Sequence, residues 1–368
     1  MKYYVIAGEA SGDLHGANLL RALQQKDPKA KVRAWGGDRM QAQGASLVKH
    51  YRELAFMGFW EVAKNLRTIL KNIQFCKEDI AAFTPDALIL IDYPGFNLRI
   101  AEWAKTQGIP VHYYISPQVW AWKENRVKKM KQAIDYLYVI LPFEKLFFEE
   151  KHRFPVDFVG HPLLDEIAQF DAGSDVDFRA ENKLPKDKPI VALLPGSRMQ
   201  EVKKMISVMA ATATQFPDHC FVVAAAPHLD PTLFESLPVY IVKNKTYTLL
   251  SHATAALVTS GTATLETALF EVPQVVCYKT SALSYIIGKQ VVKLPFISLV
   301  NLILDTEAVP ERIQSACNPK QLATDLTSIL KGEKRNEQLS AYKTLKAKLG
   351  GSGASEKVAA LITERTNA

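Results

Sequence analysis

Short apolar segments of strand length alternate with helix-forming segments along most of the chain. In the first half the apolar segments are Tyr3–Ala7, Lys31–Gly36, Pro85–Ile91, Val111–Ile115, Tyr136–Leu141 and Val156–Val159. In the second half they are Ile190–Leu194, Cys220–Ala225, Val239–Val242, Ala255–Thr259 and Gln274–Tyr278. Strands that alternate with helices predict an α/β fold with parallel sheets covered by helices.

The polar stretch 170–188 interrupts this alternation, and we expect the linker between two domains around it. A chain of 368 residues is long enough for two domains of ordinary size. We therefore predict an N-terminal Rossmann-like domain over residues 1–168 and a C-terminal one over 169–349. A flexible glycine-rich break then precedes a last amphipathic helix over 354–366.

Composition narrows the class of protein. A hydrophobic content of 48% and a charged content of 23% are typical of a soluble globular protein, and the longest apolar runs are too short to span a bilayer. The first residues enter a strand directly, so we expect no secretory signal. The four cysteines are scattered without paired spacing, which predicts reduced thiols in the cytosol and no zinc site. The net charge of +7 favours an anionic partner: a nucleotide, a phospholipid surface or nucleic acid.

One turn in the second half has the features of an anion-binding site. Ser260–Glu266 follows a predicted strand and opens a helix, so free backbone N–H groups and the positive end of the helix dipole lie there. Gly261 permits close approach of the backbone, and Glu266 would accept hydrogen bonds from the two hydroxyls of a ribose. A simple capping pattern is the alternative. The hydroxyl donors of this turn belong to Ser260, Thr262 and Thr264.

A second turn of the same kind follows the predicted strand Ile190–Leu194. Gly196 and Ser197 offer backbone and hydroxyl donors, and Arg198 offers a planar fork for a phosphate. Glu201 lies near the start of the helix that follows. Two phosphate-suited turns in one domain predict a nucleotide site there.

The first half carries acidic turns instead. Gly8–Asp13 joins the first predicted strand to a helix, but its glycine spacing is not the dinucleotide fingerprint. Its acids favour a hydroxyl-bearing or cationic group over a phosphate, unless Asp13 or Ser11 only caps the helix. Asp92 ends a predicted buried strand, at the edge where open α/β sheets bind ligands. Burial would raise its pKa toward that of a general base, and a turn or N-cap aspartate is the alternative.

Two further segments suggest contact with an amphiphile. Trp120 and Trp122 follow the strand Val111–Ile115 and would form a platform for a sugar or an acyl chain. The segment Lys123–Lys131 has five basic residues against one acid and would bind a phosphate or a lipid head group, or simply be a solvated face. The predicted helix Phe56–Lys77 starts with large apolar residues and carries basic ones, so it is either a core helix or a membrane-surface helix.

The order and spacing of several segments resemble the lipid-A-disaccharide synthase family over nearly the whole chain. These segments are Gly8–Asp13, Leu54–Gly58, Ile91–Asn97, Ser116–Trp122, Leu141–Glu144, Gly160–Pro162, Leu193–Arg198 with Glu201, and Ser260–Glu266. The resemblance implies the GT-B architecture, with two Rossmann-like domains facing a cleft. The acceptor would bind the N-terminal domain and the UDP-sugar the C-terminal one, and helix 354–366 would pack back on the N-terminal domain.

The resemblance also implies an activity. This is an inverting hexosyltransferase that condenses UDP-2,3-diacylglucosamine with 2,3-diacylglucosamine 1-phosphate, giving the β-1,6-linked lipid A disaccharide 1-phosphate and UDP. Asp92 would be the general base for the acceptor 6-hydroxyl. The donor would be bound by Gly196, Ser197, Arg198, Glu201, Ser260, Gly261, Thr262, Thr264, Glu266 and Asn301. The acceptor would be bound by Glu9, Ser11, Gly12, Asp13, Trp120, Trp122 and Arg126.

The implied reaction needs no metal and no cofactor, and the implied location is the cytoplasmic face of the inner membrane, with peripheral attachment. Gly95 stands where other family members often carry an acid, and His15 and His112 are alternative bases that rank lower.

Three other functions compete with this one. A UDP-N-acetylglucosamine 2-epimerase would use the same scaffold but would not need an apolar acceptor surface. A non-catalytic, membrane-associated nucleotide sensor would bind UDP without turnover. A nucleic-acid binder is suggested only by the charge, since no known nucleic-acid module is visible.

Overall fold

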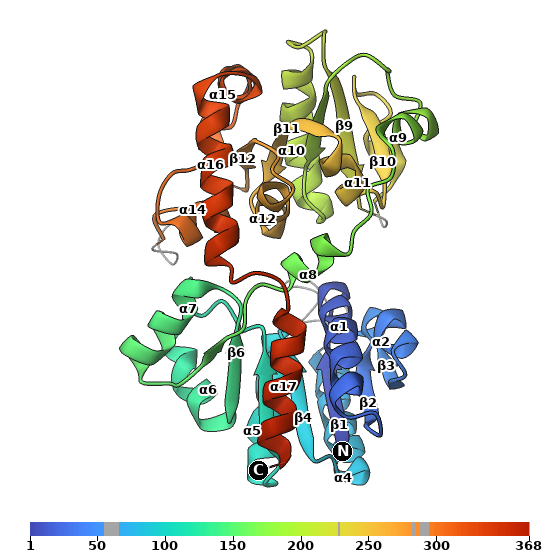
Figure 1. The fold of residues 1–368 in the computed structure, drawn as a ribbon, viewed down its shortest axis with the longest axis vertical. Helices are drawn as coiled ribbons and strands as arrows, with labels where there is room; N and C mark the ends of the chain where they lie inside the picture. Colours follow the sequence, from blue (N-terminus) through green and yellow to red (C-terminus); the bar gives the residue numbers. More distant parts are fainter. Residues whose placement is uncertain (55–65, 227–228, 282–284, 287–293, 368) are drawn as a thin grey trace. The chain divides into compact units, whose positions relative to one another are not determined.

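The computed structural model describes residues 1–54, 66–226, 229–281, 285–286 and 294–367. The chain divides into two compact units (Figure 1). Unit 1 comprises Met1–Asp165 and Leu349–Ala368, and unit 2 comprises Glu166–Lys348. Each unit is built on one sheet in which every paired strand is parallel. The α/β class predicted from the alternation of apolar and helix-forming segments is confirmed.

The sheet of unit 1 has the strand order β3-β2-β1-β4-β5-β6-β7. Its strands are β1 (Lys2–Ala7), β2 (Lys31–Gly36), β3 (Ser46–His50), β4 (Ala87–Ile91), β5 (Val111–Tyr114), β6 (Tyr136–Val139) and β7 (Asp157–Phe158). The chain reverses its direction of winding between β1 and β4, which are neighbours. In open parallel sheets this switch point, at the carboxyl ends of the strands, is where ligands bind.

Helices cover both faces of this sheet. They are α1 (Ala10–Lys26), α2 (Asp38–Ala42), α4 (Leu66–Phe83), α5 (Pro94–Thr106), α6 (Val127–Ala133), α7 (Pro142–Leu146) and α17 (Ala354–Asn367), with α8 (Leu163–Ala168) at the boundary with unit 2. Single turns or short helices are η1 (Tyr51–Glu53), η2 (Glu124–Arg126) and η3 (Phe147–Lys151). Alternate residues of β1 face opposite layers: Tyr4 and Ile6 pack with α4, α5 and α6, whereas Tyr3 and Val5 pack with α1 and α17. Because helices cover both faces, both sets of β1 residues are buried.

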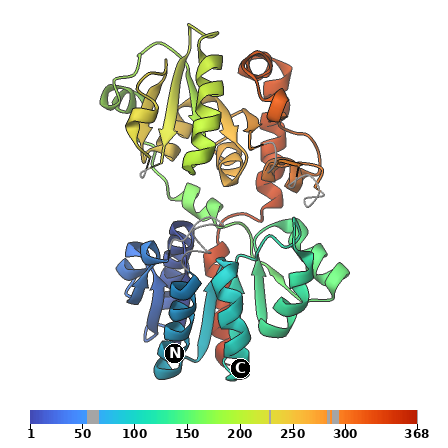
Figure 2. The ribbon, with the colours of Figure 1, turned by 180° about the vertical axis from the view of Figure 1, so that it is seen from behind.

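Helix α17 returns to unit 1 from the far end of the chain and packs along α1 (Figure 1). Val358, Ala359 and Ile362 lie in the same buried cluster as Leu19 and Leu23 of α1. The start of α17 is tied down by the Asp165 carboxylate, which accepts hydrogen bonds from the N–H groups of Gly353 and Ser355. The opposite face of the sheet is covered by α4 and α5, as Figure 2 shows.

The sheet of unit 2 repeats the topology of unit 1, with the order β10-β9-β8-β11-β12-β13. Its strands are β8 (Ile190–Leu194), β9 (Cys220–Ala225), β10 (Tyr240–Lys243), β11 (Ala253–Thr259), β12 (Gln274–Tyr278) and β13 (Glu311–Ile313). Its helices are α9 (Asp175–Glu181), α10 (Met199–Ala213), α11 (Thr246–Ser251), α12 (Thr262–Leu269), α14 (Leu299–Leu304), α15 (Pro319–Leu330) and α16 (Glu333–Lys348), with the turns η4 (Pro231–Leu233) and η5 (Gln314–Ala316). Helices α10 and α15 cover one face, and α9 and α11 cover the other. The switch point lies between β8 and β11.

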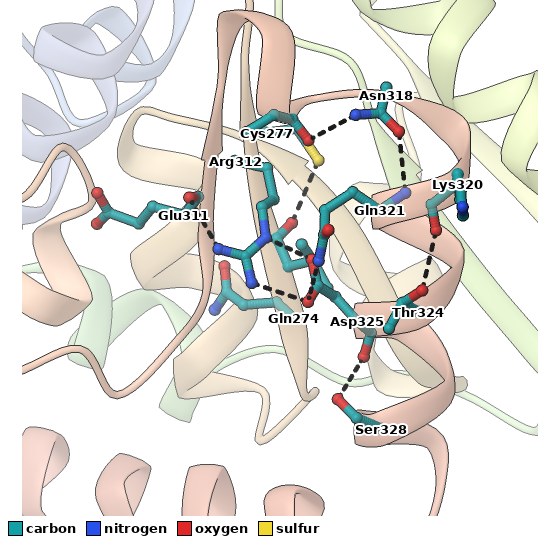
Figure 3. Close-up of polar contacts among 12 residues, drawn as sticks. Gln274, Cys277, Glu311, Arg312, Asn318, Lys320, Gln321, Thr324, Asp325 and Ser328 are labelled. Atoms are coloured by element: carbon teal, nitrogen blue, oxygen red, sulfur yellow. Dashed lines mark hydrogen bonds and ion pairs between the residues drawn. The ribbon is translucent and has the colours of Figure 1, made fainter.

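A polar network fastens the edge strand β13 to helix α15 (Figure 3). The Arg312 guanidinium donates to both carboxylate oxygens of Asp325, at 2.5 and 2.8 Å. This fork-to-fork pair fixes orientation as well as distance. The neighbouring Glu311 points the other way and accepts hydrogen bonds from the N–H groups of Ile297 and Ser298. The network therefore connects a helix of the unit to the segment that begins α14.

Some sequence expectations differ from the structure. The stretch 170–188, expected as a linker, contains α9, and Phe178 and Leu184 are buried in the core of unit 2. Strands β3 and β13 were not predicted, because their residues are only half-buried and show no apolar run. The predicted helix 56–77 is described only from Leu66, where α4 runs on to Phe83. The apolar segment Phe56–Trp60 lies outside the described residues.

Candidate active site

A pocket of about 380 Å³ opens in unit 2 at the carboxyl ends of β8, β9 and β11. It is lined by Leu194, Gly196, Ser197, Arg198, Glu201, Ala224, Ala226, Thr246, Thr259, Ser260, Gly261, Thr262, Ala263 and Glu266. Of the residues predicted from the sequence to bind the donor, all but Thr264 and Asn301 line this pocket. The pocket thus gathers the two phosphate-suited turns at the switch point of the sheet.

The first turn leads from β8 into α10. Gly196 has a φ of 103°, and a Cβ there would lie 3.0 Å from Oε2 of Glu201, so both backbone conformation and space require glycine. Arg198 precedes the first residue of α10, and no side-chain hydrogen bond caps this helix. The Arg198 side chain is 73% exposed and is held loosely by Glu201, with 3.3 Å between Nη1 and Oε1. Backbone N–H groups and a guanidinium on one wall suit a phosphate.

The second turn leads from β11 into α12, and it uses its hydroxyls differently from the prediction. Ser260 Oγ donates to the carbonyl of Ile297 at 2.7 Å, and Thr264 Oγ1 donates to the carbonyl of Gly261 at 2.8 Å. In this structure these two hydroxyls donate to backbone carbonyls and stabilise the turn, whereas the sequence predicted donation to a ligand. Thr262 is exposed, and its hydroxyl has no hydrogen-bond partner among the described residues. A Cβ at Gly261 would meet nothing within 4 Å, so the backbone is open to the pocket.

Glu266 lies one turn into α12 with its carboxylate held in place. The hydroxyl of Tyr247 donates to Oε1 of Glu266 at 3.2 Å. Burial raises the pKa of Glu266, the bond from Tyr247 lowers it, and the charge of Glu166 raises it. Tyr247 is itself packed against Phe170 and Phe270, with ring centroids 5.5 and 5.1 Å away. The sequence analysis missed Tyr247, although its position just after β10 ends could have indicated it.

Asn301 does not reach the pocket. Its side chain is fully buried, donates to the carbonyl of Val309 and to Glu311, and accepts from the N–H of Val309, each at 2.9 Å. Glu311 also binds the start of α14, and the carbonyl of Ile297 in this segment accepts from Ser260. In this structure Asn301 therefore supports the Ser260 turn from behind, and its amide is satisfied by the protein.

In unit 1 the strand β4 ends in a strained turn at Asp92. Asp92 and Tyr93 have φ values of 44° and 49°, which non-glycine residues rarely adopt. The carbonyl of Asp92 accepts hydrogen bonds from Tyr113 Oη at 2.6 Å and from Asn97 Nδ2 at 2.8 Å. Side chains from β5 and α5 thus hold the backbone of the turn that carries the Asp92 side chain.

The environment of Asp92 favours a protonatable carboxyl. Burial raises its pKa to about 6, the charge of Glu9 adds to this effect, and the N–H of Tyr93 opposes it. Glu9 lies at the end of the neighbouring strand β1, directly before α1. A carboxylate with a pKa near 6 is deprotonated at neutral pH but remains basic enough to accept a proton.

The turn that carries Glu9 is partly structural. The Asp13 carboxylate accepts hydrogen bonds from the N–H groups of Gly37, Arg39 and Met40, at 2.7, 3.2 and 3.1 Å. It therefore serves as an N-terminal cap for α2, which is a different role from the predicted contact with an acceptor. Gly12 is also buried, and its Cβ position lies 3.2 Å from Cβ of Ala7. Glu9 and Ser11 remain accessible.

The tryptophan loop is anchored by a buried acid that the sequence analysis did not place in the site. Nε1 of Trp120 donates to Glu144 Oε1 at 3.2 Å, and the ring packs edge-on against Phe143. Glu144 also accepts from the N–H groups of Ile140 and Leu141. Burial raises the pKa of Glu144 to about 7, and the charge of Asp92 contributes to this rise. Glu144 therefore lies close to Asp92 and positions Trp120.

Of the two alternative bases, His112 is packed in the interior, whereas His15 is only partly buried. His112 lies in the middle of β5, fully buried, with Nδ1 2.8 Å from Tyr138 Oη. Burial lowers the pKa of His112 to about 3 and that of His15 to about 4. His112 is therefore not placed to meet a substrate at the end of the sheet as Asp92 is.

Among the described residues, no helix is long and apolar enough to cross a membrane. The same part of the chain contains no group of three or more His, Cys, Asp or Glu side chains arranged to hold a metal ion.

Comparisons with known proteins identify relatives along the whole chain. A family model described as lipid-A-disaccharide synthetase matches residues 3–363. The lipid-A-disaccharide synthase of Syntrophus aciditrophicus is 40% identical over 369 residues, covering 97% of this chain and 96% of the relative. That of Myxococcus xanthus is 36% identical over 371 residues, covering 98% and 96%.

Solved structures with similar folds are far more distant in sequence. The UDP-GlcNAc 2-epimerase from Neisseria meningitidis, bound to UDP-GlcNAc, has a TM-score of 0.70 with 14% identity and covers 99% of this chain and 100% of its own. The calicheamicin glycosyltransferase has a TM-score of 0.62 with 15% identity, covering 100% and 98%. These likenesses confirm the GT-B fold but do not distinguish an epimerase from a transferase.

Proposed function

The chain belongs to the lipid-A-disaccharide synthase family, and from this membership and the two sheet edges we propose the reaction that it catalyses. It transfers 2,3-diacylglucosamine from UDP to the 6-hydroxyl of 2,3-diacylglucosamine 1-phosphate. The products are the β-1,6-linked disaccharide 1-phosphate and UDP. The observation that carries the proposal is the pocket of unit 2, where two helix starts, Arg198 and an oriented Glu266 surround one cavity.

The donor nucleotide occupies this pocket. Its diphosphate lies against the Gly196 and Gly261 turns, where backbone N–H groups and Arg198 offset the negative charge that develops on UDP as it leaves. Glu266, held by Tyr247, accepts hydrogen bonds from the ribose hydroxyls. Ser197, Glu201, Ser260 and Thr262 complete the contact surface, while Thr264 and Asn301 keep the turn in shape.

Asp92 of unit 1 is the general base. The oxygen of the acceptor 6-hydroxyl attacks the anomeric carbon of the donor as its proton passes to the Asp92 carboxylate, and the bond from that carbon to UDP breaks. Attack from the face opposite the leaving group inverts the anomeric configuration. The raised pKa of about 6 and the rigid turn support this role.

The acceptor binds at the same edge of unit 1. Glu9 and Ser11 are accessible beside the end of β4, and Trp120 is fixed by Glu144. Trp122 is 46% exposed, and Arg126 follows it in the next turn. Residues 1–168 thus form the acceptor domain, helix 354–366 belongs to it, and residues 169–349 form the donor domain.

The protein works at the cytoplasmic face of the inner membrane, to which it attaches peripherally. Its substrates are acylated and partition into that membrane. The exposed side chains of Leu70 and Phe75 on α4 supply apolar surface beside the basic residues of this helix.

A turnover assay tests the proposal. Purified protein is given both substrates in mixed detergent micelles with EDTA, and formation of the disaccharide 1-phosphate and of UDP is followed. We expect stoichiometric formation of both products, with β-linkage. Release of free sugar epimers without a disaccharide would contradict the proposal and favour the epimerase, and UDP binding without any turnover would favour a sensor.

A further inference from the structure

A tight turn beside Trp122 brings two positive charges together. The N–H of Arg126 donates to the carbonyl of Lys123 at 3.0 Å, which closes the single 3₁₀ turn η2. Lys123 precedes the turn with φ of 60° and ψ of 40°, and this hydrogen bond brings its backbone next to that of Arg126. The pKa of Lys123 is lowered, first by burial and then by the charge of Arg126, which is consistent with this proximity.

The neighbouring acid does not neutralise this pair. Glu124 lies between the two cations in sequence, but its carboxylate pairs with Lys151 at 2.7 Å and His152 at 3.0 Å. Within the described ranges, no carboxylate lies at ion-pair distance from Lys123 or Arg126. The turn therefore presents two uncompensated cations to an incoming anion.

The position of this pair relates it to the candidate base. Burial raises the pKa of the Tyr113 hydroxyl and the charge of Arg126 partly offsets that rise, and this hydroxyl donates to the carbonyl of Asp92 at 2.6 Å. Lys123 Nζ lies 4.0 Å above the ring of Trp122. The segment that carries Trp122, Lys123 and Arg126 follows the carboxyl end of β5, and Asp92 follows that of the neighbouring strand β4, so both lie at one edge of the unit 1 sheet.

We propose that Lys123 and Arg126 form an anion subsite that takes the phosphate monoester of the acceptor. This inference rests on the proposed function and adds how the acceptor is oriented. Arg126 offers two parallel N–H donors to phosphate oxygens, and Lys123 adds a point charge. Anchoring the phosphate on one side of the sugar ring leaves the 6-hydroxyl, on the other side, to face Asp92.

The test compares 2,3-diacylglucosamine 1-phosphate with the same lipid lacking the phosphate. Binding of each lipid to the full-length protein in neutral detergent micelles is measured by calorimetry, and turnover with UDP-2,3-diacylglucosamine is measured in parallel. We expect the protein to bind the phosphorylated lipid roughly tenfold to hundredfold more tightly, as charge-assisted hydrogen bonds imply. Arg126→Ala should remove most of that preference, and Lys123→Ala a smaller part.

Lys29→Ala is the matched control, because it removes one exposed positive charge next to the start of β2, at the other end of the strands. It should leave the preference unchanged. An unaltered preference for the phosphorylated lipid in both Lys123→Ala and Arg126→Ala would overturn the subsite, as would no preference in the unmodified protein.

Two further outcomes separate this inference from others. If Arg126→Ala weakens binding to phosphatidylglycerol vesicles but leaves the preference between the two acceptors intact, the cations serve the membrane and the subsite is wrong. If the unmodified protein binds the phosphorylated lipid in preference, loses that preference in both variants, and yet forms no disaccharide, the subsite stands and the proposed reaction fails.

Discussion

At the switch point of unit 1, β1 and β4 lead into Glu9 and Asp92, whereas at the switch point of unit 2, β8 and β11 lead into the Gly196 and Gly261 turns. The strand order is the same in both sheets up to the sixth strand. The backbone therefore offers a ligand site at the same place in each unit, and the side chains decide which ligand it suits.

The difference lies in how charge is placed at that edge. In unit 1 the charge of one carboxylate raises the pKa of the next: Glu9 raises that of Asp92, and Asp92 raises that of Glu144. In unit 2 the corresponding turns carry glycine, uncapped N–H groups and Arg198. The first arrangement suits a general base, and the second suits an anion.

The largest expected effect follows from replacing the base. Asp92→Asn keeps the size of the side chain and removes its ability to take a proton, so we expect kcat to fall by roughly 10²–10⁴-fold. The affinity for UDP, measured by calorimetry, should stay unchanged because the pocket of unit 2 is intact. A kcat within threefold of the unmodified protein would show that Asp92 is not the base.

The acidic edge should also set the pH dependence of the rate. A general base must be deprotonated, and the pKa of Asp92 is raised to about 6, so kcat/KM should rise with pH through about 6 and level off above it. Glu9→Gln removes a negative charge that raises this pKa. The acid limb of the profile should then move to lower pH. A limb that stays in place in Glu9→Gln would mean that it reports another group.

In unit 2 the predicted effects are on affinity. Glu266→Gln should weaken UDP binding by roughly tenfold to hundredfold, because a hydrogen bond to a charged group contributes about 1.5–3 kcal/mol. Tyr247→Phe keeps the contacts with Phe170 and Phe270 and removes the hydroxyl that orients Glu266. We expect it to weaken UDP binding by about threefold to tenfold.

The same change at Tyr240, which is 41% exposed on β10, is the control for Tyr247→Phe. Calorimetric titration with UDP measures all three variants. Equal affinities in Tyr247→Phe and Tyr240→Phe would indicate that Glu266 is oriented without help from Tyr247.

Much of this contrast was visible in the sequence. Strand ends followed by Gly196, by Ser260–Glu266 and by Asp92 predicted both edges, since the carboxyl ends of parallel strands share one side of a sheet. The class of fold and the family could likewise be predicted from apolar alternation and ordered motifs. Element types were predictable wherever burial on both faces leaves a continuous apolar run, as in β4 and β8.

What the sequence could not reveal is which polar side chains the protein itself uses. Asp13 and Glu9 are both acids of the same predicted turn, but the Asp13 carboxylate accepts its hydrogen bonds from backbone N–H groups at the start of α2. Asn301 was predicted as a ligand contact, yet its partners are Glu311, in a strand that carried no apolar signal, and Val309, just before that strand. Such assignments depend on tertiary partners, which local pattern does not encode.

The buried acid Glu144 gives a smaller, pH-dependent prediction on stability. Its pKa is raised from 4.5 to about 7, so the stability associated with its neutral form is present below pH 4.5 and is lost as the pH rises through 7. The shift corresponds to roughly 3 kcal/mol across that window. Glu144→Gln cannot ionise, so its stability relative to the unmodified protein should increase from pH 4.5 to pH 8.

Tryptophan fluorescence is a suitable probe, because all five tryptophans fall within the residues of unit 1. Urea midpoints of the fluorescence transition are measured at several pH values for the unmodified protein, Glu144→Gln and the exposed control Glu150→Gln. If the urea midpoints of Glu144→Gln and of the unmodified protein changed with pH in parallel, burial would not raise the pKa of Glu144.

The smallest effect concerns Gly95, in the first turn of α5 next to the Asp92 turn. A Cβ at this position would meet nothing within 4 Å, so a carboxylate fits there and interacts favourably with the start of the helix. Gly95→Asp should stabilise unit 1 by about 0.5–1.5 kcal/mol in urea unfolding, from helix propensity and the helix dipole together. By contrast, Gly8→Ala should destabilise unit 1 strongly, because the added Cβ would lie 2.2 Å from the Tyr93 ring.

The carboxylate introduced by Gly95→Asp also adds negative charge beside Asp92. The acid limb of the pH–rate profile should therefore move to higher pH, opposite to its shift in Glu9→Gln. If Gly95→Asp and Glu9→Gln moved the acid limb in the same direction, the charge at the unit 1 edge would not be what sets the pKa of Asp92.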